Sequence, residues 1–126
     1  MAPASEILSR TRIYDAFVPI YNGHRPRAVS IRGQSYPVKS WRSLFLKVCE
    51  VARDRRPSDF GSITKLRGKK APWFSKSAAD LRDPVEIDGT GIYTEANQNA
   101  NALVLRCFHV LHYFGLEPML KIDLAD

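Results

Sequence analysis

The stretch from Tyr36 to Arg56, YPVKSWRSLFLKVCEVARDRR, constrains the fold more than any other, because it joins a strand to a capped amphipathic helix. Its apolar residues recur at i, i+3, i+4, i+7, i+8 and i+11, which places them on one helical face. These residues are Trp41, Leu44, Phe45, Val48, Cys49 and Ala52. Ser40 precedes them and can accept a hydrogen bond from the first free amide groups. Three arginines suit the negative end of the helix dipole, and Pro57 prevents simple continuation.

Length and charge narrow the class of protein. The chain has 126 residues, 44% hydrophobic and 25% charged, which indicates one globular domain with a single core. Nineteen Lys and Arg against 13 Asp and Glu give a net charge of +6 and a pI near 9.6. Such an excess of positive charge favours a polyanionic partner, nucleic acid first and an anionic membrane surface second.

The two cysteines, Cys49 and Cys107, fall on the apolar faces of expected helices, where a free cysteine behaves as a small hydrophobe. We therefore expect both to be reduced and buried. Residues 1–12 contain no apolar secretion signal, and no apolar run approaches membrane-spanning length. Reduced thiols without a secretion signal indicate a cytoplasmic protein without a membrane partner.

The N-terminal part of the chain is predicted to be an arm. Residues 4–17 can start a short helix after Ser5, and prolines together with an Asn-Gly pair interrupt the segment that follows. We therefore divide the chain into an arm or short helix at residues 1–27 and a single compact domain at residues 28–126.

The compact part is expected to begin with a β-hairpin. Residues 28–32 and 35–39 are short extended runs, and Gly33-Gln34 is the predicted turn between them. Pro37 lacks a backbone donor, so the second strand is expected at a sheet edge or strand end.

The region after the first helix is predicted to contain several short elements. Ser58 is expected to cap a short second helix. The aromatic content of residues 71–75 suggests a short strand, and Ser77 to Asp80 has the S-x-x-D form of a capping box that opens one helical turn. Residues 85–87 and 92–94 flank a turn with two glycines, most simply a second hairpin.

The longest periodic run follows residues 97–99. Its apolar residues recur at i, i+4, i+7, i+8 and i+11 and predict a helix. They are Leu103, Cys107, Val110, Leu111 and Phe114. Gly115 stands at the expected C-cap, and residues 119–124 alternate as a final strand. The order ββα(α)ββαβ predicts an α+β fold, with two main helices on one face of a small, mainly antiparallel sheet.

Positive charge is concentrated between Arg53 and Lys76, where eight basic residues stand against two acidic ones. The basic residues are Arg53, Arg55, Arg56, Lys65, Arg67, Lys69, Lys70 and Lys76. Gly68 would let the backbone pass close to a phosphate, and Trp73 follows within reach of a base or sugar. These nine side chains, the eight cations and Trp73, form the predicted nucleic-acid site. The alternative is a solvated loop after a helix, with Trp73 and Phe74 in the core.

Catalytic and metal sites find little support. His109 and His112 lie at i, i+3 without a third ligand, so we expect a pair on the helix surface and no metal or other cofactor. Buried cysteines lack the electropositive, accessible setting of a reactive thiolate. The carboxylates Asp83, Glu86 and Asp88 suggest a metal-dependent nuclease, but the accompanying lysine does not follow at the usual spacing. We therefore expect that the protein is not an enzyme.

Four segments carry a resemblance. They are Ile31-Arg32-Gly33, Tyr36-Pro37-Val38-Lys39-Ser40-Trp41, Trp73-Phe74-Ser75 and Thr90-Gly91-Ile92-Tyr93-Thr94-Glu95. Together they resemble a small accessory α+β module of prokaryotic restriction and anti-phage defence proteins, over about residues 28–124. The resemblance implies an accessory domain beside a nuclease or ATPase, and not a catalytic core.

The expected function is nucleic-acid binding, DNA before RNA and duplex DNA first, through phosphate contacts from the basic segment. The alternative is a protein-interaction module that docks a larger enzyme through an exposed edge strand, at residues 35–39 or 119–124. A metal-dependent nuclease is a distant third.

Overall fold

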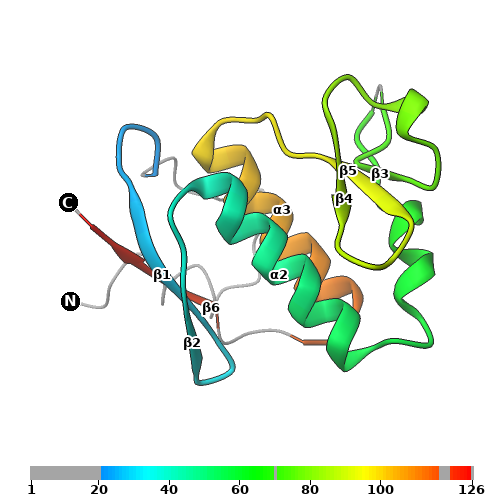
Figure 1. Cartoon of the computed structure of the whole chain (residues 1–126). Coiled ribbons are helices and arrows are strands. Elements are labelled where there is room, and N and C mark those ends of the chain that lie inside the picture. Colours follow the sequence, from blue (N-terminus) through cyan, green and yellow to red (C-terminus); the bar gives the residue numbers. More distant parts are fainter. Residues whose placement is uncertain (1–20, 70, 117–119, 126) are drawn as a thin grey trace.

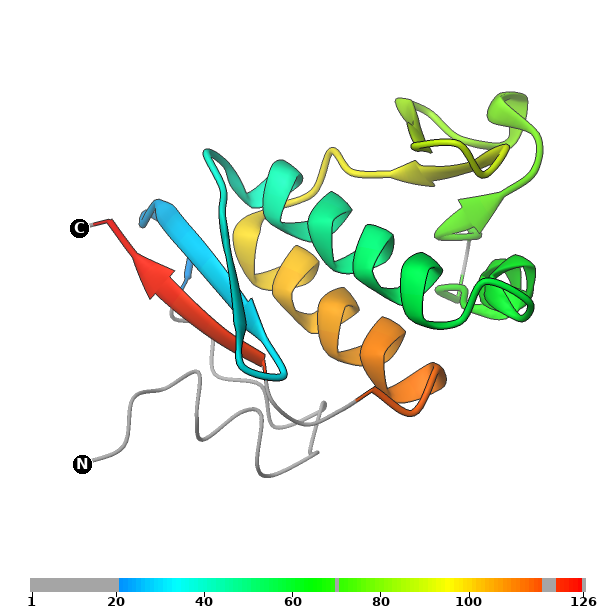
Figure 2. The same cartoon turned by 60° about the horizontal axis from the view of Figure 1, so that its bottom comes forward.

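The computed structural model describes residues 21–69, 71–116 and 120–125. Two helices lie side by side in the middle of the molecule, with a three-stranded antiparallel sheet on each side of them (Figures 1 and 2). The predicted α+β class is confirmed, and the order of the elements matches the prediction. The strands, however, form two small sheets where the sequence predicted one.

The first sheet starts with the predicted hairpin of β1 (Pro26–Ile31) and β2 (Gln34–Pro37). Its turn consists of Arg32 and Gly33, with φ of 52° and 86°. The predicted turn was therefore wrong by one residue, because Gln34 already pairs in β2. Tight two-residue hairpin turns need positive φ at both positions, which glycine adopts without strain. As expected, β2 lies at the sheet edge.

The third strand of this sheet comes from the other end of the chain. β6 (Leu120–Leu124) pairs antiparallel with the free side of β1, which gives the order β2-β1-β6. The Arg27 guanidinium contacts the Asp123 carboxylate at 3.1 Å across this pair, and the Ala125 amide donates to the Arg25 carbonyl. The first sheet therefore joins strands from the two ends of the described chain.

The helix α2 (Trp41–Arg55) begins as predicted. The Ser40 hydroxyl accepts from the Ser43 amide, and the Ser43 hydroxyl accepts from the Ser40 amide, both at 3.0 Å. This reciprocal capping box satisfies two amide groups at the helix start. The predicted apolar face is buried except for Trp41, which is half-buried and donates from Nε1 to the His24 carbonyl at 2.7 Å.

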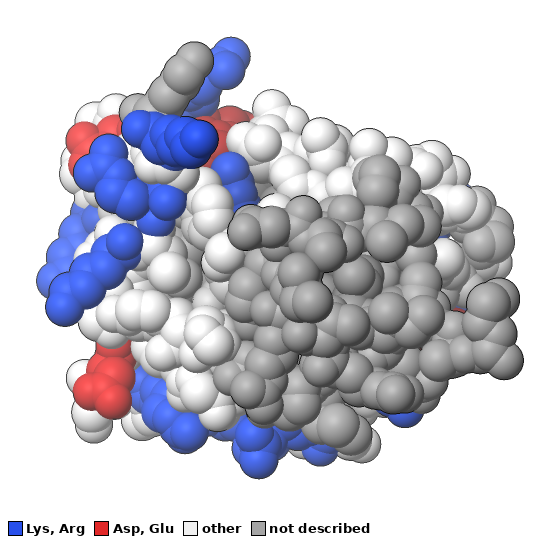
Figure 3. Space-filling view, turned by 180° about the vertical axis from the view of Figure 1, so that it is seen from behind, with Lys and Arg blue, Asp and Glu red and all other residues white. Residues whose placement is uncertain are grey.

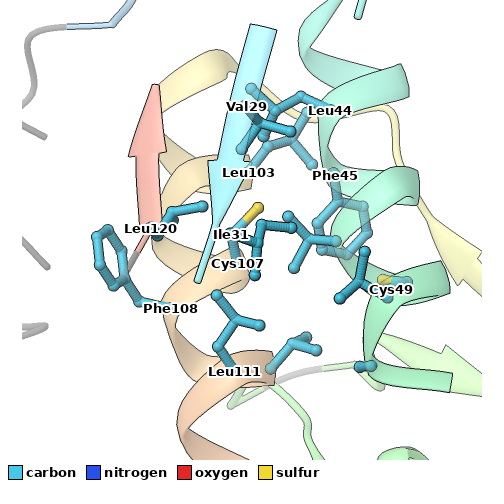
Figure 4. Packing of buried hydrophobic residues seen from close by; sticks show 14 of the residues in the cluster. Val29, Ile31, Leu44, Phe45, Cys49, Leu103, Cys107, Phe108, Leu111 and Leu120 are labelled. Atoms are coloured by element: carbon cyan, nitrogen blue, oxygen red, sulfur yellow. The ribbon is translucent and has the colours of Figure 1, made fainter. Parts of the chain in front are cut away.

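The helix α3 (Ala100–Tyr113) packs along α2 and supplies the other half of the core. Asn99 caps it by accepting from the Ala102 amide, and Gly115 takes a left-handed conformation with φ of 68° after its end. Figure 4 shows side chains from both helices and β1 meeting in one cluster. Cys49 and Cys107 are free and fully buried there, as predicted.

The second sheet is built from neighbouring residues. β4 (Pro84–Ile87) and β5 (Ile92–Glu95) form the predicted second hairpin, and β3 (Phe74–Ser75) adds to the other side of β5 in the order β3-β5-β4. β2 and β6 occupy both sides of β1, and the second hairpin pairs with neither of them. The buried residue Phe74 of β3 instead packs the second sheet against α2, and the ring centroids of Phe45 and Phe74 are 6.1 Å apart.

The predicted helical turn after Ser77 is present as a short 3-10 helix, η3 (Ala78–Asp80), but its predicted capping box is wrong. No side-chain hydrogen bond caps η3. The Asp80 carboxylate instead accepts from the Ser75 hydroxyl at 2.6 Å, and that hydroxyl accepts from the Ser77 amide. Asp80 is thus bound to the buried Ser75 hydroxyl and does not take part in a cap at the start of η3.

Two predictions at the chain ends lie outside the described residues: the helix after Ser5 and the inclusion of Met119 in the last strand. Tyr21, which falls in the predicted arm, is only 1% exposed, and β1 begins two residues earlier than the predicted boundary. The division at residue 27 stays a prediction.

Candidate nucleic-acid interface

Arg53 lies near the end of α2 and contacts two parts of the fold. Its Nε donates to the Asp54 carboxylate at 2.9 Å, and one of its terminal nitrogens donates to the Asp88 carbonyl in the β4–β5 turn. The hydrogen bond to Asp54 raises the pKa of Arg53 above its ordinary value, against a smaller opposing effect of desolvation. Arg53 therefore ties α2 to the second sheet, while the next cations, Arg55 and Arg56, stay exposed.

The predicted short helix after Pro57 is the 3-10 helix η2 (Phe60–Lys65). Phe60 stacks on Phe114 with the ring centroids 5.7 Å apart, and Ile63 is fully buried. The predicted cap at Ser58 is wrong, because η2 starts after the next residue and no side chain caps it. The two buried side chains hold η2 against α3 and leave its polar end in solvent.

A tight loop follows η2 and carries Lys69. Arg67 and Pro72 pair across it, and the Gly68 amide donates to the Ala71 carbonyl at 3.0 Å. A Cβ atom at Gly68 would lie 3.0 Å from Nε1 of Trp73, closer than ordinary van der Waals contact. Because Gly68 has no side chain, it leaves room for the Trp73 indole. The sequence had suggested that it leaves room for a phosphate.

Trp73 is half-buried and meets two side chains of α3. The Arg106 guanidinium carbon lies 4.8 Å from the indole centroid, and the His109 ring meets the indole edge-on at 5.4 Å. Arg106 also donates to the Glu95 carbonyl at 3.1 Å. Burial lowers the pKa of Arg106 below its ordinary value, and the nearby Glu95 carboxylate partly opposes this. Arg106 is thus a partly desolvated cation stacked on an aromatic face.

A surface hollow of about 450 Å³ opens beside this pair. Lys69 and Arg82 line it together with Trp73 and Arg106. The Glu95 carboxylate also lines it, but one of its oxygens already accepts from the amides of Arg82 and Asp83, each at 2.9 Å. Asp80 lines it too and accepts from the Ser75 hydroxyl, so the hollow combines three cations and an indole with two carboxylates that are hydrogen-bonded within the fold.

Four of the other predicted cations line two further hollows. Arg53 and Lys76 line one of about 380 Å³ beside the Gly89-Thr90-Gly91 turn. Arg56 and Lys65 line one of about 410 Å³. The structure thus distributes the predicted residues over three hollows, and Lys70 lies outside the described residues.

These cations share one side of the molecule. Seen from behind, Lys and Arg side chains gather on the side that carries the second sheet, at the left of Figure 3, with others along the lower edge. Arg55 and Arg67 are exposed and line none of the three hollows. The basic segment therefore forms a broad charged surface with hollows in it.

Sequence reasoning missed Arg106 and Arg82. Arg106 is the one Lys or Arg in the otherwise apolar α3, and a lone charge in an apolar helix is a signal that it has a specific partner. Arg82 had no such signal, because its place at the hollow depends on the hydrogen bonds between Glu95 and the backbone of the loop.

No group of three or more His, Cys, Asp and Glu residues that could hold a metal ion occurs in the described parts of the chain. Among the carboxylates considered for a nuclease, Glu86 accepts from the Gly91 amide at 3.1 Å and so stabilises the β4–β5 turn. Within residues 21–69, 71–116 and 120–125, no helix combines the length and apolar character needed to span a bilayer.

Comparison with known proteins gives no relative for this chain: no protein-family model, curated protein or solved structure matches it.

Proposed function

We propose that the protein binds nucleic acid, duplex DNA first, through phosphate contacts from the cations between Arg53 and Lys76. The observation that carries the proposal is that six of these cations are exposed and form no ion pair with another described residue. They are Arg55, Arg56, Lys65, Arg67, Lys69 and Lys76. Unpaired cations on one surface repel one another, and a polyanion relieves that repulsion.

No described carboxylate forms an ion pair with these cations. Asp54 pairs with Arg53, and Asp80 accepts from the Ser75 hydroxyl, which leaves the charge of Asp80 in place. In contrast, on the first sheet Arg27 is paired with Asp123. Exposed cations without an ion pair also occur at Arg32, Lys39 and Arg42, but the basic segment has six of them between residues 55 and 76, and this density supports a local binding site.

Salt dependence tests the proposal. Each phosphate that a cation neutralises releases condensed counterion, with a slope of about −0.9 in the logarithmic plot for duplex DNA. We expect the change of Lys65, Arg67 and Lys69 together to Gln to weaken binding of all sequences alike and to flatten the slope by about 2 to 3 units. Fluorescence anisotropy with a labelled duplex at several salt concentrations measures both effects.

A matched control removes three cations elsewhere. Arg32, Lys39 and Arg42 are exposed and lie on the hairpin turn and the start of α2. Arg32→Asn suits the left-handed backbone there, and the other two change to Gln. This variant has the same net charge as the first but keeps the basic segment. Equal loss of binding in the two variants, or no salt-sensitive binding by the unmodified protein, would contradict the proposal.

A docking module is the second candidate, and the first sheet supplies the observation that favours it. Both β2 and β6 are edge strands whose described neighbour is β1 alone. An extended segment of a larger enzyme can add to such an edge through main-chain hydrogen bonds. This is the function we would infer if the protein bound no nucleic acid at low salt.

The biological setting that we propose follows from the resemblance to accessory modules of restriction and defence proteins. In that setting the chain is a DNA-holding part that works beside a nuclease or ATPase. Co-expression with such an enzyme encoded next to it, followed by size-exclusion chromatography with and without DNA, tests for a complex. Independent elution of the two proteins in both conditions would contradict the setting and leave DNA binding untouched.

A further inference from the structure

The hollow beside Trp73 contains more than phosphate contacts need. A continuous duplex offers phosphates on its outside and keeps its bases stacked within. Lysine and arginine on an open surface suffice to bind those phosphates. Here an indole and a partly desolvated guanidinium line a hollow of about 450 Å³, a volume within the range of small-molecule sites.

The groups left available in the hollow define a ligand chemistry. One oxygen of Glu95 is occupied by two amides, and Asp80 is bound to Ser75. Lys69 and Arg82 are exposed and unpaired among the described residues. An aromatic face, a stacked guanidinium and two free cations fit a flat ring joined to a separate, negatively charged group, and a nucleotide has both in its base and its phosphate.

We propose that the hollow takes one unpaired nucleotide of a nucleic-acid strand, with its base against Trp73 and Arg106 and its phosphate near Lys69 and Arg82. The inference rests on the proposed nucleic-acid binding and specifies its substrate. A base inside a duplex reaches such a hollow only after unstacking, and this costs least when the base has no partner. The protein therefore prefers duplexes that contain an unpaired nucleotide over fully paired ones.

Three labelled DNAs test the preference: a paired duplex, the same duplex with a one-nucleotide bulge, and the bulge with an abasic residue. The abasic DNA keeps the bend and the extra phosphate but lacks the base. We expect the bulge to bind about 5- to 150-fold more tightly than the abasic bulge, the range that stacking of one base on an aromatic side chain provides. The paired duplex should resemble the abasic DNA.

A pair of glycine variants separates the hollow from overall stability. Gly68→Ala introduces a Cβ atom 3.0 Å from Nε1 of Trp73 and so displaces the indole, whereas Gly61→Ala meets nothing within 4 Å. Neither glycine has a positive φ, so backbone strain does not distinguish them. We expect Gly68→Ala to lose the preference for the bulge and Gly61→Ala to keep it. Trp73→Leu should also lose it, whereas the surface change Arg82→Gln should weaken the bulged and the abasic DNA alike and leave the melting temperature unchanged.

Tryptophan fluorescence gives a readout that a structural role would not affect. The chain has two tryptophans, and Trp41 is bound to the His24 carbonyl and does not line the hollow. In the variant Trp41→Phe the emission comes from Trp73 alone. We expect the bulged DNA to quench it and the abasic bulge to leave it nearly unchanged, since base stacking on the indole requires the base.

The outcomes keep the two proposals apart. Salt-sensitive binding of all three DNAs with equal affinity and no quenching would overturn the unpaired-nucleotide site and leave phosphate binding intact. Free dAMP that competes as well as the bulged DNA would overturn the strand as the source of the nucleotide. Failure to bind any DNA, while dAMP quenches Trp73, would overturn the proposed function itself.

Discussion

The two sheets have the same number of strands and the same antiparallel pairing, yet they are built in different ways. The first joins β1 to β6 across most of the described chain, and its cross-strand charges, Arg27 and Asp123, are paired. The second uses only residues 74–95, and one of its strands has two residues. Side chains hold its loops: Glu95 accepts from two loop amides, and Thr94 donates to the Trp73 carbonyl at 2.9 Å.

This difference suggests a division of roles. The first sheet closes the fold, because long-range pairing of β1 with β6 buries its central strand against the helices. The second sheet positions loops, and its loops carry Lys69, Trp73 and Arg82 around one hollow. Polar tethers suit this role, since each fixes a loop through one or two hydrogen bonds without a large core.

The largest expected effect comes from a matched pair of core substitutions. Ile31, in the central strand β1, and Ile87, at the end of the edge strand β4, are both 1% exposed. We expect Ile31→Ala to lose about 4 to 5 kcal/mol and Ile87→Ala about 2 to 3 kcal/mol, because an edge strand with one neighbour can collapse around the missing atoms more easily than a central strand held on both sides. Urea melts of the two variants measure the difference. An equal or reversed order would remove the distinction between the sheets.

The helix layer between the sheets supplies a pH prediction. Burial raises the pKa of the thiols of Cys49 on α2 and Cys107 on α3 above their ordinary value. The thiols stay protonated in the folded protein and ionise in the unfolded chain, so their stabilisation is complete at neutral pH and declines above pH of about 9.

Above that pH we expect the free energy of unfolding to fall by about 1.4 kcal/mol per pH unit for each thiol. Urea melts between pH 7 and 10 measure the slope, and Cys107→Ala should halve it. Local exchange in both sheets should accelerate together, since the helix layer supports each of them. Loss confined to one sheet would mean that the sheets do not share this core.

Glu95 tests the comparison between the two sheets, because its hydrogen bonds are among those that hold the loops of the second sheet in place. Glu95→Ala removes the acceptor for the Arg82 and Asp83 amides and should cost about 1 to 3 kcal/mol. Hydrogen exchange should accelerate at residues 80–84 and stay unchanged in β1. If exchange changes equally in both places, the tether supports the whole fold and not only the loop.

Ser40 and Ser77, both predicted to cap helical turns, show the same contrast between the two sheets. Ser40 beside the first sheet makes a complete capping box, whereas Ser77 beside the second makes no cap hydrogen bond through its side chain. We expect Ser40→Ala to cost about 1 kcal/mol and Ser77→Ala less than about 0.3 kcal/mol. Thermal melts of the two variants compare them, and equal losses would show that the cap at Ser40 contributes little.

The smallest effect should come from the surface ion pair of the first sheet. Arg27 and Asp123 have side chains 66% and 56% exposed, so water screens their attraction. Arg27→Gln should change stability by less than about 0.5 kcal/mol and leave DNA binding unaltered. A loss of binding similar to that of Lys69→Gln would extend the interface to the first sheet and weaken the assignment of separate roles.

The sequence by itself determined the elements whose signals are local. The 3.6-residue spacing of apolar residues located α2 and α3, and Ser40 and Gly115 marked helix ends because capping depends on neighbouring residues only. Alternating runs located both hairpins and the final strand. The basic segment was visible for the same reason, since charge can be counted along the chain.

Only the tertiary structure decided how those elements meet. Short antiparallel strands carry no signal for the sheet to which they belong, so the pairing of β6 with β1 and the formation of a second sheet were visible only in the folded chain. The capping motif at Ser77 failed because Ser75, buried by the fold, attracted Asp80. Arg106 reaches Trp73 from α3, 33 residues away, and such contacts follow from packing and not from local sequence.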